Sequence, residues 1–406
     1  MSSDNLKVRI ARSMAEIDAD QWNACANPHL NAPATPFDDC DPQKERFNPF
    51  VAHAFLNVME TSGSATSRAG WAPAHVLVED DGMLLAAAPA YVKSHSMGEY
   101  VFDHAWADAY ERAGGQYYPK IQVSVPFTPA QGRRLLIAPS ERADTAEKAL
   151  IAGLRALRDK VGASSIHITF SRKEEWDSLG EAGFLQRTGK QFHFFNKGYA
   201  TFDDFLADLA SRKRKNIRKE RAEALSNGIT IEALTGADIK ELHWDAFYAF
   251  YMDTGSRKWG QPYLTRKFYS QIGEAMAGDI LLVMAKRAGR YIAGAINFIG
   301  ADALYGRNWG AVEEHPFLHF ECCYYQAIDF ALSRGLSRVE AGAQGEHKLA
   351  RGYAPVTTYS AHDIADKGFR RAVASYLDQE RKQIAEAIEI YAGHVPFRKV
   401  EVEEQP

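Results

Sequence analysis

An amphipathic helix that leads into a short apolar strand and a polar turn constrains the fold of this chain more than any other segment. Apolar residues recur in the helix at positions i, i+3, i+4 and i+7, which places them on one face. They are Phe320, Cys323, Tyr324, Ala327, Ile328, Ala331 and Leu332. Gly335 stands where a left-handed cap ends a helix, and residues 337–341 then form a buried strand. This order predicts an α/β fold with mixed sheets.

The turn after this strand, residues 340–353, gathers ionisable side chains among glycines. Polar residues at the carboxyl end of a strand mark the ligand crevice of α/β sheets. The alternative interpretation is an ordinary turn with solvated charges. His347 is the first candidate for a catalytic base, because its ordinary pKa lies near neutrality. The other candidate bases are Glu346, Glu340 and Glu321, and the candidate substrate contacts are Gln344, Lys348 and Arg351.

Strands and helices alternate through the rest of the chain, and no repeat is visible in the sequence itself. In the N-terminal half we expect hairpin strands at 75–79 and 84–92, strands at 121–125 and 133–137, a helix at 145–161 and a strand at 165–170. In the C-terminal half we expect hairpin strands at 279–286 and 291–299, a strand at 303–309, and then the helix and strand described above. A boundary near residue 198 would give domains 1–198 and 199–406. A final helix, 367–391, is expected to be scaffold, and the sequence does not decide whether it also forms a dimer seam.

A long helix that begins near Phe202 carries a dense run of cations. Residues 212–221 contain seven basic side chains and one acidic one. Only Ile217 in this run continues the apolar stripe, so the cations surround the helix. Arg214, Lys215 and Arg218 are the expected contacts for a phosphate-bearing donor, since guanidinium groups pair well with phosphate. The alternative is a solvated helix that keeps the protein soluble.

A third polar cluster lies between residues 91 and 120. Its histidines and carboxylates invite a metal interpretation, but their spacing matches no zinc signature, and we expect no metal. Two alternatives remain, a polar ligand pocket at the domain interface and structural hydrogen bonding. The candidate substrate contacts are Tyr91, Lys93, His95, Glu99, Asp103 and Tyr118.

Composition narrows the class of protein. With 406 residues, 46% of them hydrophobic, and a net charge of -4, the chain is globular and has no overall field to attract nucleic acid. It contains no apolar run of about 18 residues and no apolar signal core at Met1. The four cysteines form no CxxC pair, which is typical of a reducing compartment. We therefore expect a cytoplasmic protein without a membrane span.

Two distant segments carry a resemblance to a known family. One reads Pro89-Ala90-Tyr91-Val92-Lys93-Ser94-His95-Ser96-Met97-Gly98-Glu99-Tyr100-Val101-Phe102-Asp103 and continues through Trp106 to Tyr117-Tyr118-Pro119-Lys120 and Pro126-Phe127-Thr128-Pro129. The other is His319-Phe320-Glu321-Cys322-Cys323-Tyr324-Tyr325-Gln326 with the turn that follows. Over nearly its full length the chain resembles the bacterial FemAB-like family, which is related to peptidoglycan biosynthesis or recognition and placed in the GNAT acyltransferase superfamily.

The resemblance implies two tandem GNAT-like domains of the Fem type, with acyl-CoA or aminoacyl-tRNA as alternative acyl donors and no firmly implied cofactor. It places an acyl cleft between the strand ending near Trp309 and Gly310 and the strand ending at Glu340. It also likens the basic helix to that of Fem-type transferases, whose substrates include aminoacyl-tRNA and a lipid-linked pyrophosphate. The common GNAT phosphate loop is missing, and Glu313 and Glu314 stand in its place, which weakens the case for acyl-CoA.

Two classes of function follow from these observations. The first is an N-acyltransferase or aminoacyltransferase that forms an amide bond on a small-molecule or peptide-like amine acceptor, such as a cell-wall precursor. The second is a noncatalytic GNAT-fold protein that recognises a cell-wall or metabolite ligand. A nucleic-acid regulator comes third, because no recognition fold accompanies the basic helix.

Overall fold

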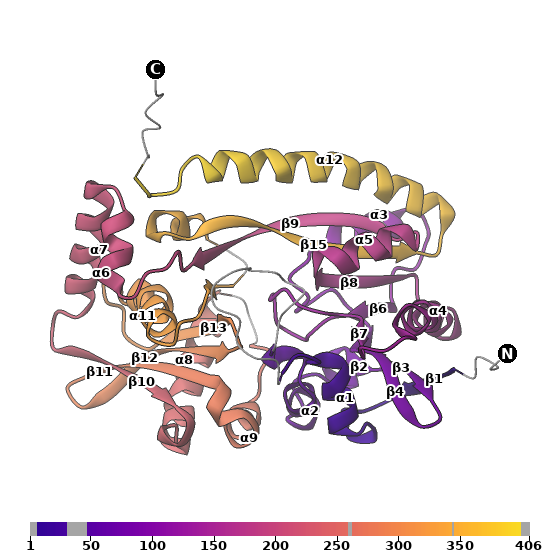
Figure 1. Cartoon of the computed structure of the whole chain (residues 1–406), viewed down its shortest axis with the longest axis horizontal. Helices are drawn as coiled ribbons and strands as arrows, with labels where there is room; N and C mark the ends of the chain where they lie inside the picture. The colour runs from indigo at the N-terminus through magenta and orange to yellow at the C-terminus, as the bar shows by residue number, and fades with distance from the viewer. Residues whose placement is uncertain (1–5, 31–46, 259–261, 343–344, 399–406) are drawn as a thin grey trace. The chain divides into compact units, whose positions relative to one another are not determined.

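The computed structural model describes residues 6–30, 47–258, 262–342 and 345–398 (Figure 1). The chain divides into two compact units, here called unit 1 and unit 2. Unit 1 comprises residues 1–189, 262–278 and 357–385, and unit 2 comprises residues 190–261, 279–356 and 386–406. Strands β9 (Leu185–Phe195) and β15 (Ala354–Ile364) each contribute residues to both units. The compact units are therefore not consecutive halves of the chain, and the predicted domain boundary at residue 198 stays a prediction.

Unit 1 is built on two groups of strands. One sheet has the order β1-β3-β4-β7, and the other strands follow the order β15-β8-β6-β5-β2. The strands are β1 (Lys7–Ala11), β2 (Trp71–Pro73), β3 (His75–Asp80), β4 (Met83–Ala88), β5 (Ala90–Lys93), β6 (Lys120–Val123), β7 (Leu136–Ile137) and β8 (Ser165–Ser171). The helices are α1 (Ala19–Ala26), α2 (His53–Thr61), α3 (His104–Arg112), α4 (Ala143–Val161), α5 (Lys173–Glu181) and α9 (Arg266–Met276).

The predicted hairpin of unit 1 is confirmed, with one difference. β3 and β4 pair antiparallel, and Asp81 and Gly82 have φ angles of 47° and 83° in the turn between them. This left-handed pair is the turn that the right-handed twist of a hairpin favours. The strand predicted at 84–92 is instead two strands separated at Pro89, and β5 pairs with β2 and β6. Proline has no N–H to donate and so interrupts the strand pairing there.

The predicted crossover of unit 1 is present as well. β6 and β8 are parallel, and α4 connects them through the intervening segment. α4 buries Leu150, Leu154 and Leu157 in the same core as Ile121 and Ile166. The apolar face that is readable at helical spacing in the sequence is therefore the face that packs on the sheet.

Unit 2 contains the strand order β10-β11-β12-β13-β14-β9. Its strands are β10 (Ile229–Thr235), β11 (Ile280–Arg287), β12 (Arg290–Ile299), β13 (Ala303–Ala311) and β14 (Arg338–Glu340). The predicted β11–β12 hairpin is confirmed, with left-handed residues Ala288 and Gly289 in its turn. α8 (Glu241–Lys258) packs against β12 and β13, and α12 (Lys367–Ala392) closes the chain. α12 buries Val373 and Leu377 in the part of the helix that belongs to unit 1.

The helix between β13 and β14 contains a π turn that the sequence did not predict. It consists of α10 (Leu318–Phe320), a π-helical turn at Glu321–Tyr325 and α11 (Gln326–Ser333). Gly335 follows with a φ of 65°, which confirms the predicted left-handed cap. π turns are rare and occur often at functional sites. This one carries Glu321 and Tyr324, which belong to the site described below.

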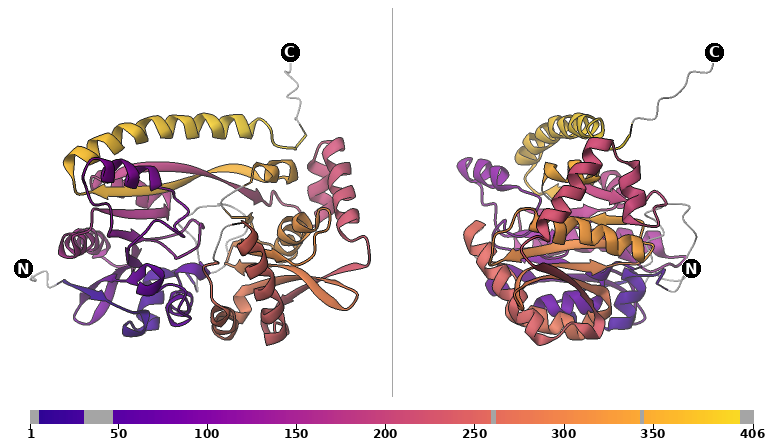
Figure 2. Two further views of the ribbon diagram at one scale, coloured as in Figure 1. Left: turned by 180° about the vertical axis from the view of Figure 1, so that it is seen from behind. Right: turned by 90° about the vertical axis from the view of Figure 1, so that its left-hand side faces the viewer.

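The basic segment lies on a helix that is shorter than predicted. The expected long helix is broken into α6 (Phe202–Asp208) and α7 (Ser211–Ala224), which Figure 2 shows as two helices. Leu209 and Ala210 have extended ψ angles of 151° and 139°. Leu209 forms an isolated β-bridge with Phe397. The two residues are far apart in the chain, so no local sequence pattern predicts this contact. None of the helices in the described ranges has the length and apolar character to cross a membrane.

Candidate functional site

A cavity lies in unit 2 where β13 and β14 part. The two parallel strands pair from Ala303 with Arg338 to Tyr305 with Glu340, and there β14 ends while β13 continues to Ala311. A bulge at Arg307 shifts the pairing of β13 with β12 at this point. The cavity has a volume of about 90 Å³. Its lining includes Asn297, Arg307, Trp309, His319, Cys323 and Tyr324. The position agrees with the acyl cleft that the resemblance implies.

Asn297 supplies a buried acceptor in the wall of this cavity. The residue is 1% exposed, and its Nδ2 donates to the Leu281 carbonyl at 3.3 Å. Its Oδ1 is buried without a hydrogen-bond partner among the described residues. A buried amide oxygen left unpaired is costly, so a ligand N–H or a water molecule is its natural partner. Sequence reasoning missed Asn297, because a single Asn in an apolar strand has no pattern of its own.

Tyr324 joins His347 to the cavity. The Tyr324 hydroxyl and His347 Nε2 are 2.8 Å apart, and Tyr324 is 4% exposed while His347 is exposed. Partial desolvation of the imidazole, followed by the charges of Arg351 and Lys348, lowers the pKa of His347. Burial raises the pKa of Tyr324. Near pH 7 the pair therefore combines a neutral imidazole with a protonated phenol, although the sequence assigned Tyr324 only to the apolar stripe.

Gly345 makes room for the imidazole of His347. Its φ is 115°, and a Cβ there would lie 2.4 Å from His347 Cε1. The glycine is needed both for its backbone conformation and for the close approach of the ring. The other predicted turn residue next to it, Gln344, lies outside the described residues.

Lys348 is an uncommon buried amine in the same turn. It is 1% exposed, and its Nζ donates to the Gly342 carbonyl at 3.0 Å. Burial lowers the pKa of Lys348 to about 8, and an opposing interaction with Cys323 raises it. The sequence predicted Lys348 as an anion contact. Its lowered pKa also suits a second proton acceptor close to the cavity.

The buried amine predicts a dependence of stability on pH. Because the pKa of Lys348 falls from 10.5 to about 8 on folding, the unfolded state binds more protons between these values. The contribution of Lys348 to the free energy of unfolding therefore rises with pH through this window. Replacing Lys348 with methionine should stabilise the protein at pH 7 by about 3 kcal/mol, and the gain should shrink above pH 8. Urea unfolding of both proteins at several pH values measures the difference, and a gain that is constant with pH would contradict it.

The carboxylates predicted as bases are engaged elsewhere. Glu346 is exposed and accepts a hydrogen bond from the Tyr391 hydroxyl. Glu321 is fully buried and accepts from Arg221 and from Gln326. Glu340 accepts from Arg338 Nε at 3.0 Å, and His193 Nε2 lies 3.8 Å away. These contacts favour structural roles for the three carboxylates and leave exposed His347 and buried Lys348 as the candidate bases of the turn.

Arg351 is likewise occupied within the protein. Its guanidinium donates to Glu220 and to the carbonyl of His347, and it lies 3.4 Å from the centre of the Phe320 ring. Only 6% of the residue is exposed. Arg351 was expected to contact the substrate. Its guanidinium instead contacts Glu220 and the backbone carbonyl of His347.

The cations of α7 divide into two groups. Arg221 points inward to Glu321 and Asp329 and stacks on Phe202, and exposed Arg218 pairs with Asp203. The others have no carboxylate within 4 Å among the residues that the structure describes. They are Arg212, Lys213, Arg214, Lys215 and Lys219. Arg212, Lys213, Arg214 and Lys215 lie at the start of α7, whose first turn has no acidic residue and no side-chain cap. They are therefore at the positive end of the helix dipole, where an anion is favourable.

The two residues predicted from the neighbouring strand differ in role. Trp309 lines the cavity and meets His319 edge to face, with 5.3 Å between ring centres. A Cβ on Gly310 would lie 2.3 Å from the backbone carbon of Phe250 in α8. Gly310 is therefore needed for the close packing of α8 on β13, which is a different reason from the predicted donor contact.

The third predicted cluster is a buried network in unit 1. Lys93, Glu99, Asp103 and Lys120 are each at most 5% exposed. Lys120 Nζ lies 2.6 Å from Asp103 and 3.4 Å from Glu99, and Lys93 Nζ lies 3.5 Å from Glu99. Two ammonium groups thus balance two carboxylates. The predicted contacts beside them are equally engaged or buried: His95 bonds to the Ala69 carbonyl, Tyr118 donates to Ser96, and Tyr91 is fully buried.

Two histidines that the sequence did not single out extend this network. The Tyr117 hydroxyl donates to Asp103 at 2.7 Å and lies 3.4 Å from His167 Nε2. His167 Nδ1 lies 2.8 Å from His362 Nδ1. Burial lowers the pKa of His167 to about 3. The two histidines are cross-strand partners on β8 and β15, so only the strand register could have revealed the pair. The geometry favours structural hydrogen bonding over an open ligand pocket.

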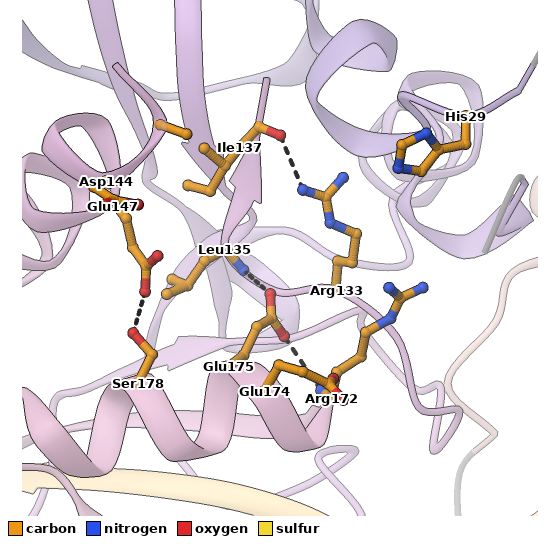
Figure 3. A pocket seen from close by; sticks show the side chains of 11 residues that line it. His29, Arg133, Leu135, Ile137, Asp144, Glu147, Arg172, Glu174, Glu175 and Ser178 are labelled. Carbon is orange, nitrogen blue, oxygen red and sulfur yellow. Dashed lines mark hydrogen bonds between the residues drawn. The ribbon is translucent and has the colours of Figure 1, made fainter. Parts of the chain in front are cut away.

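Unit 1 also has a surface cavity with mixed charges (Figure 3), of about 320 Å³. Arg133 there donates to two backbone carbonyls. Glu175 accepts from the backbone N–H groups of Arg134, Leu135 and Arg172. Arg133 and Glu175 thus make hydrogen bonds to the backbone within the fold. In the described parts of the chain no three His, Cys, Asp or Glu side chains are grouped to hold a metal ion.

Comparisons with known proteins give a family match and structural relatives. The FemAB-like family model, described as peptidoglycan biosynthesis/recognition, matches residues 13–399. The crystal structure of FemX superposes with a TM-score of 0.51 at 12% identity, and the alignment covers 88% of this chain and 98% of FemX. A tandem GNAT protein from the clavulanic acid biosynthesis pathway gives a TM-score of 0.46 at 11% identity, with 89% and 99% covered. The search of curated protein sequences found no match. The predicted α/β fold with mixed sheets is confirmed.

Proposed function

The chain belongs to the FemAB-like family, and from that premise we propose that it is an amide-forming acyltransferase whose site is the unit 2 cavity. The acceptor is an amine on a peptidoglycan precursor or a small peptide. The donor is an aminoacyl ester or another activated acyl group. We place the reaction in the cytoplasm, in keeping with the cysteine content.

The hydrogen bond between Tyr324 and His347 at the cavity carries this proposal. Amide formation needs a base for the proton of the attacking amine and an acid for the departing group. Tyr324 lines the cavity as a protonated phenol and supplies the acid. His347, with its lowered pKa, is the base and exchanges a proton with the same hydroxyl. Asn297 Oδ1 receives an N–H of the donor or the acceptor.

The cations of α7 other than Arg221 are proposed to hold the phosphates of the donor. Arg214, Lys215 and Arg218 are the contacts that we assign, together with their unpaired neighbours at the start of the helix. Glu313 and Glu314, before α10, stand where the common GNAT phosphate loop would lie, and they pair there with Arg287, Arg290 and Arg257. The cations of α7 and the missing phosphate loop together support aminoacyl-tRNA over acyl-CoA as donor.

The missing phosphate loop supports a second candidate, a protein that binds a cell-wall fragment without turnover. An assay of transfer separates the two. Purified protein is mixed with labelled aminoacyl-tRNA or acyl-CoA and with cell-wall precursor peptides, and amide product and thermal unfolding are followed together. A donor at 100 times its Kd should raise stability by about 2.7 kcal/mol.

A charge reversal on α7 tests whether the donor binds to this helix. Arg214→Glu with Arg218→Glu should abolish the donor-induced rise in Tm, whereas Lys173→Glu, an exposed position of unit 1, should leave it intact. Product formation that depends on His347 supports the transferase. Stabilisation by a precursor alone, with no product from any donor, would establish the recognition protein instead.

A further inference from the structure

Two successive residues of α7 hold the segments that carry Tyr324 and His347. Glu220 accepts hydrogen bonds from Arg351 Nη2 at 3.0 and 2.9 Å and from the Tyr325 hydroxyl. Arg221 points to Glu321. The side chains of Glu220 and Arg221 are only 19% and 22% exposed. They therefore differ from the outward cations of the same helix.

The contact of Glu220 reaches His347 through Arg351. Arg351 Nη1 donates to the backbone carbonyl of His347 at 2.8 Å. The same guanidinium lies against the Phe320 ring, whose centre is 5.5 Å from that of the His347 imidazole. Glu220 thus fixes Arg351, and Arg351 fixes the backbone and one ring neighbour of His347.

The contact of Arg221 reaches Tyr324 through the π turn. Arg221 bonds both carboxylate oxygens of Glu321, at 3.1 and 2.9 Å, and Gln326 Nε2 adds a third bond at 2.7 Å. Glu321 is fully buried and begins the π turn that contains Tyr324. Tyr325, next to Tyr324, is held by Glu220. Both halves of the Tyr324–His347 pair are therefore tied to one turn of α7.

We propose that Glu220 is a positioning residue that, through Arg351 and Tyr325, sets the geometry of the Tyr324–His347 pair. The inference rests on the proposed function for its catalytic consequence, and it deepens that function by assigning α7 a second task beside donor binding. A hydrogen bond of 2.8 Å between two side chains from different segments survives only if both segments are fixed. Neighbouring groups that orient reactive side chains contribute to rate without touching the substrate.

Conservative variants of Glu220 and Arg351 test the proposal, with Glu223→Gln on the same helix as control. Glu220→Gln keeps the shape and one acceptor but removes the charge that holds Arg351. We expect kcat for amide formation to fall about tenfold or more, with little change in KM for the donor. Arg351→Gln removes a cation that lowers the pKa of His347. That pKa should rise, and the acid limb of the pH profile should move to higher pH. Glu223→Gln should match the wild type in both readouts.

Selective ¹³C labelling of histidine gives a readout that needs no substrate. The His347 signal is assigned from its loss in His347→Gln, and its titration is followed in each variant. Glu220→Gln should displace this signal, because the imidazole loses its fixed surroundings. If Glu220→Gln is too unstable, the double variant Glu220→Gln/Arg351→Gln avoids an unpaired buried charge and should show the same displacement.

An unchanged His347 signal and an unchanged kcat in a folded Glu220→Gln protein would overturn the proposal. So would a fall in activity explained entirely by the unfolded fraction. If the proposed function itself were wrong, acyl transfer would be absent or would not respond to His347→Gln. The NMR titration would still report whether Glu220 and Arg351 position the imidazole of His347.

Discussion

Replacing His347 with glutamine is expected to lower the rate of amide formation by about 10²–10⁴-fold, the usual contribution of a general base. Glutamine keeps a polar side chain within reach of the Tyr324 hydroxyl but cannot take a proton near pH 7. The expected loss is in kcat, because His347 lies behind Tyr324 and contacts the cavity through it. Single-turnover measurements with labelled donor determine the rate of amide formation in the wild type and in the variant.

The wild-type profile should show an acid limb where His347 becomes protonated. Since desolvation and the nearby cations lower its pKa below the ordinary value, the imidazole stays neutral to lower pH than a free histidine. Tyr324→Phe should lose activity as well, because it removes the hydroxyl that faces the cavity. His315→Gln, a histidine paired with Glu313 outside the cavity lining, serves as the control. Full activity in His347→Gln would transfer the role of base to Lys348.

Replacing Asp103 with alanine should destabilise the protein by about 3–5 kcal/mol, the usual consequence of removing one partner of a buried ion pair. Lys120 would keep Glu99 at 3.4 Å but lose its bond of 2.6 Å, and Tyr117 would lose its acceptor. Both lysine and carboxylate are at most 3% exposed. Urea unfolding at pH 7 measures the loss.

The exposed pair of Lys173 and Asp177 in the same unit provides the comparison. Asp177→Ala should cost less than about 1 kcal/mol, since water already screens that pair. The effect of Asp103→Ala should also depend on pH. Burial raises the pKa of Asp103, but Lys120 and His167 outweigh it and bring the pKa below 3.8. The contribution of Asp103 is therefore full above that pH and is lost as the pH falls through the lower folded value. If Asp103→Ala lowered the free energy of unfolding by less than about 1 kcal/mol at pH 7, the buried network would contribute little to stability.

The resemblance and the residue pattern together anticipated the site in part. The helix rhythm, the Gly335 cap and the strand after it predicted where β14 would end, and the cavity lies there. His347 was chosen for its ordinary pKa and is placed beside the cavity. Glu346 and Arg351 were grouped with it because they share its turn, and Glu321 because it lies in the preceding helix, yet their side chains bind Tyr391, Glu220 and Arg221. Proximity along the chain does not determine which way a side chain points.

The sequence by itself determined the elements whose cause is local. Apolar residues at helical spacing fixed α4 and α11, and left-handed residues such as Gly82 and Gly289 fixed the hairpins, since only nearby backbone geometry is involved. Three features were decided by the tertiary structure alone. They are the break at Leu209, where the chain pairs with Phe397, the π turn at which Glu321 contacts Arg221, and the contact between His167 and His362. Each of these depends on a partner more than 90 positions away along the chain, as with Arg221 and Glu321. Such contacts form only when loop closure is repaid by burial across the whole unit, which a local pattern does not encode.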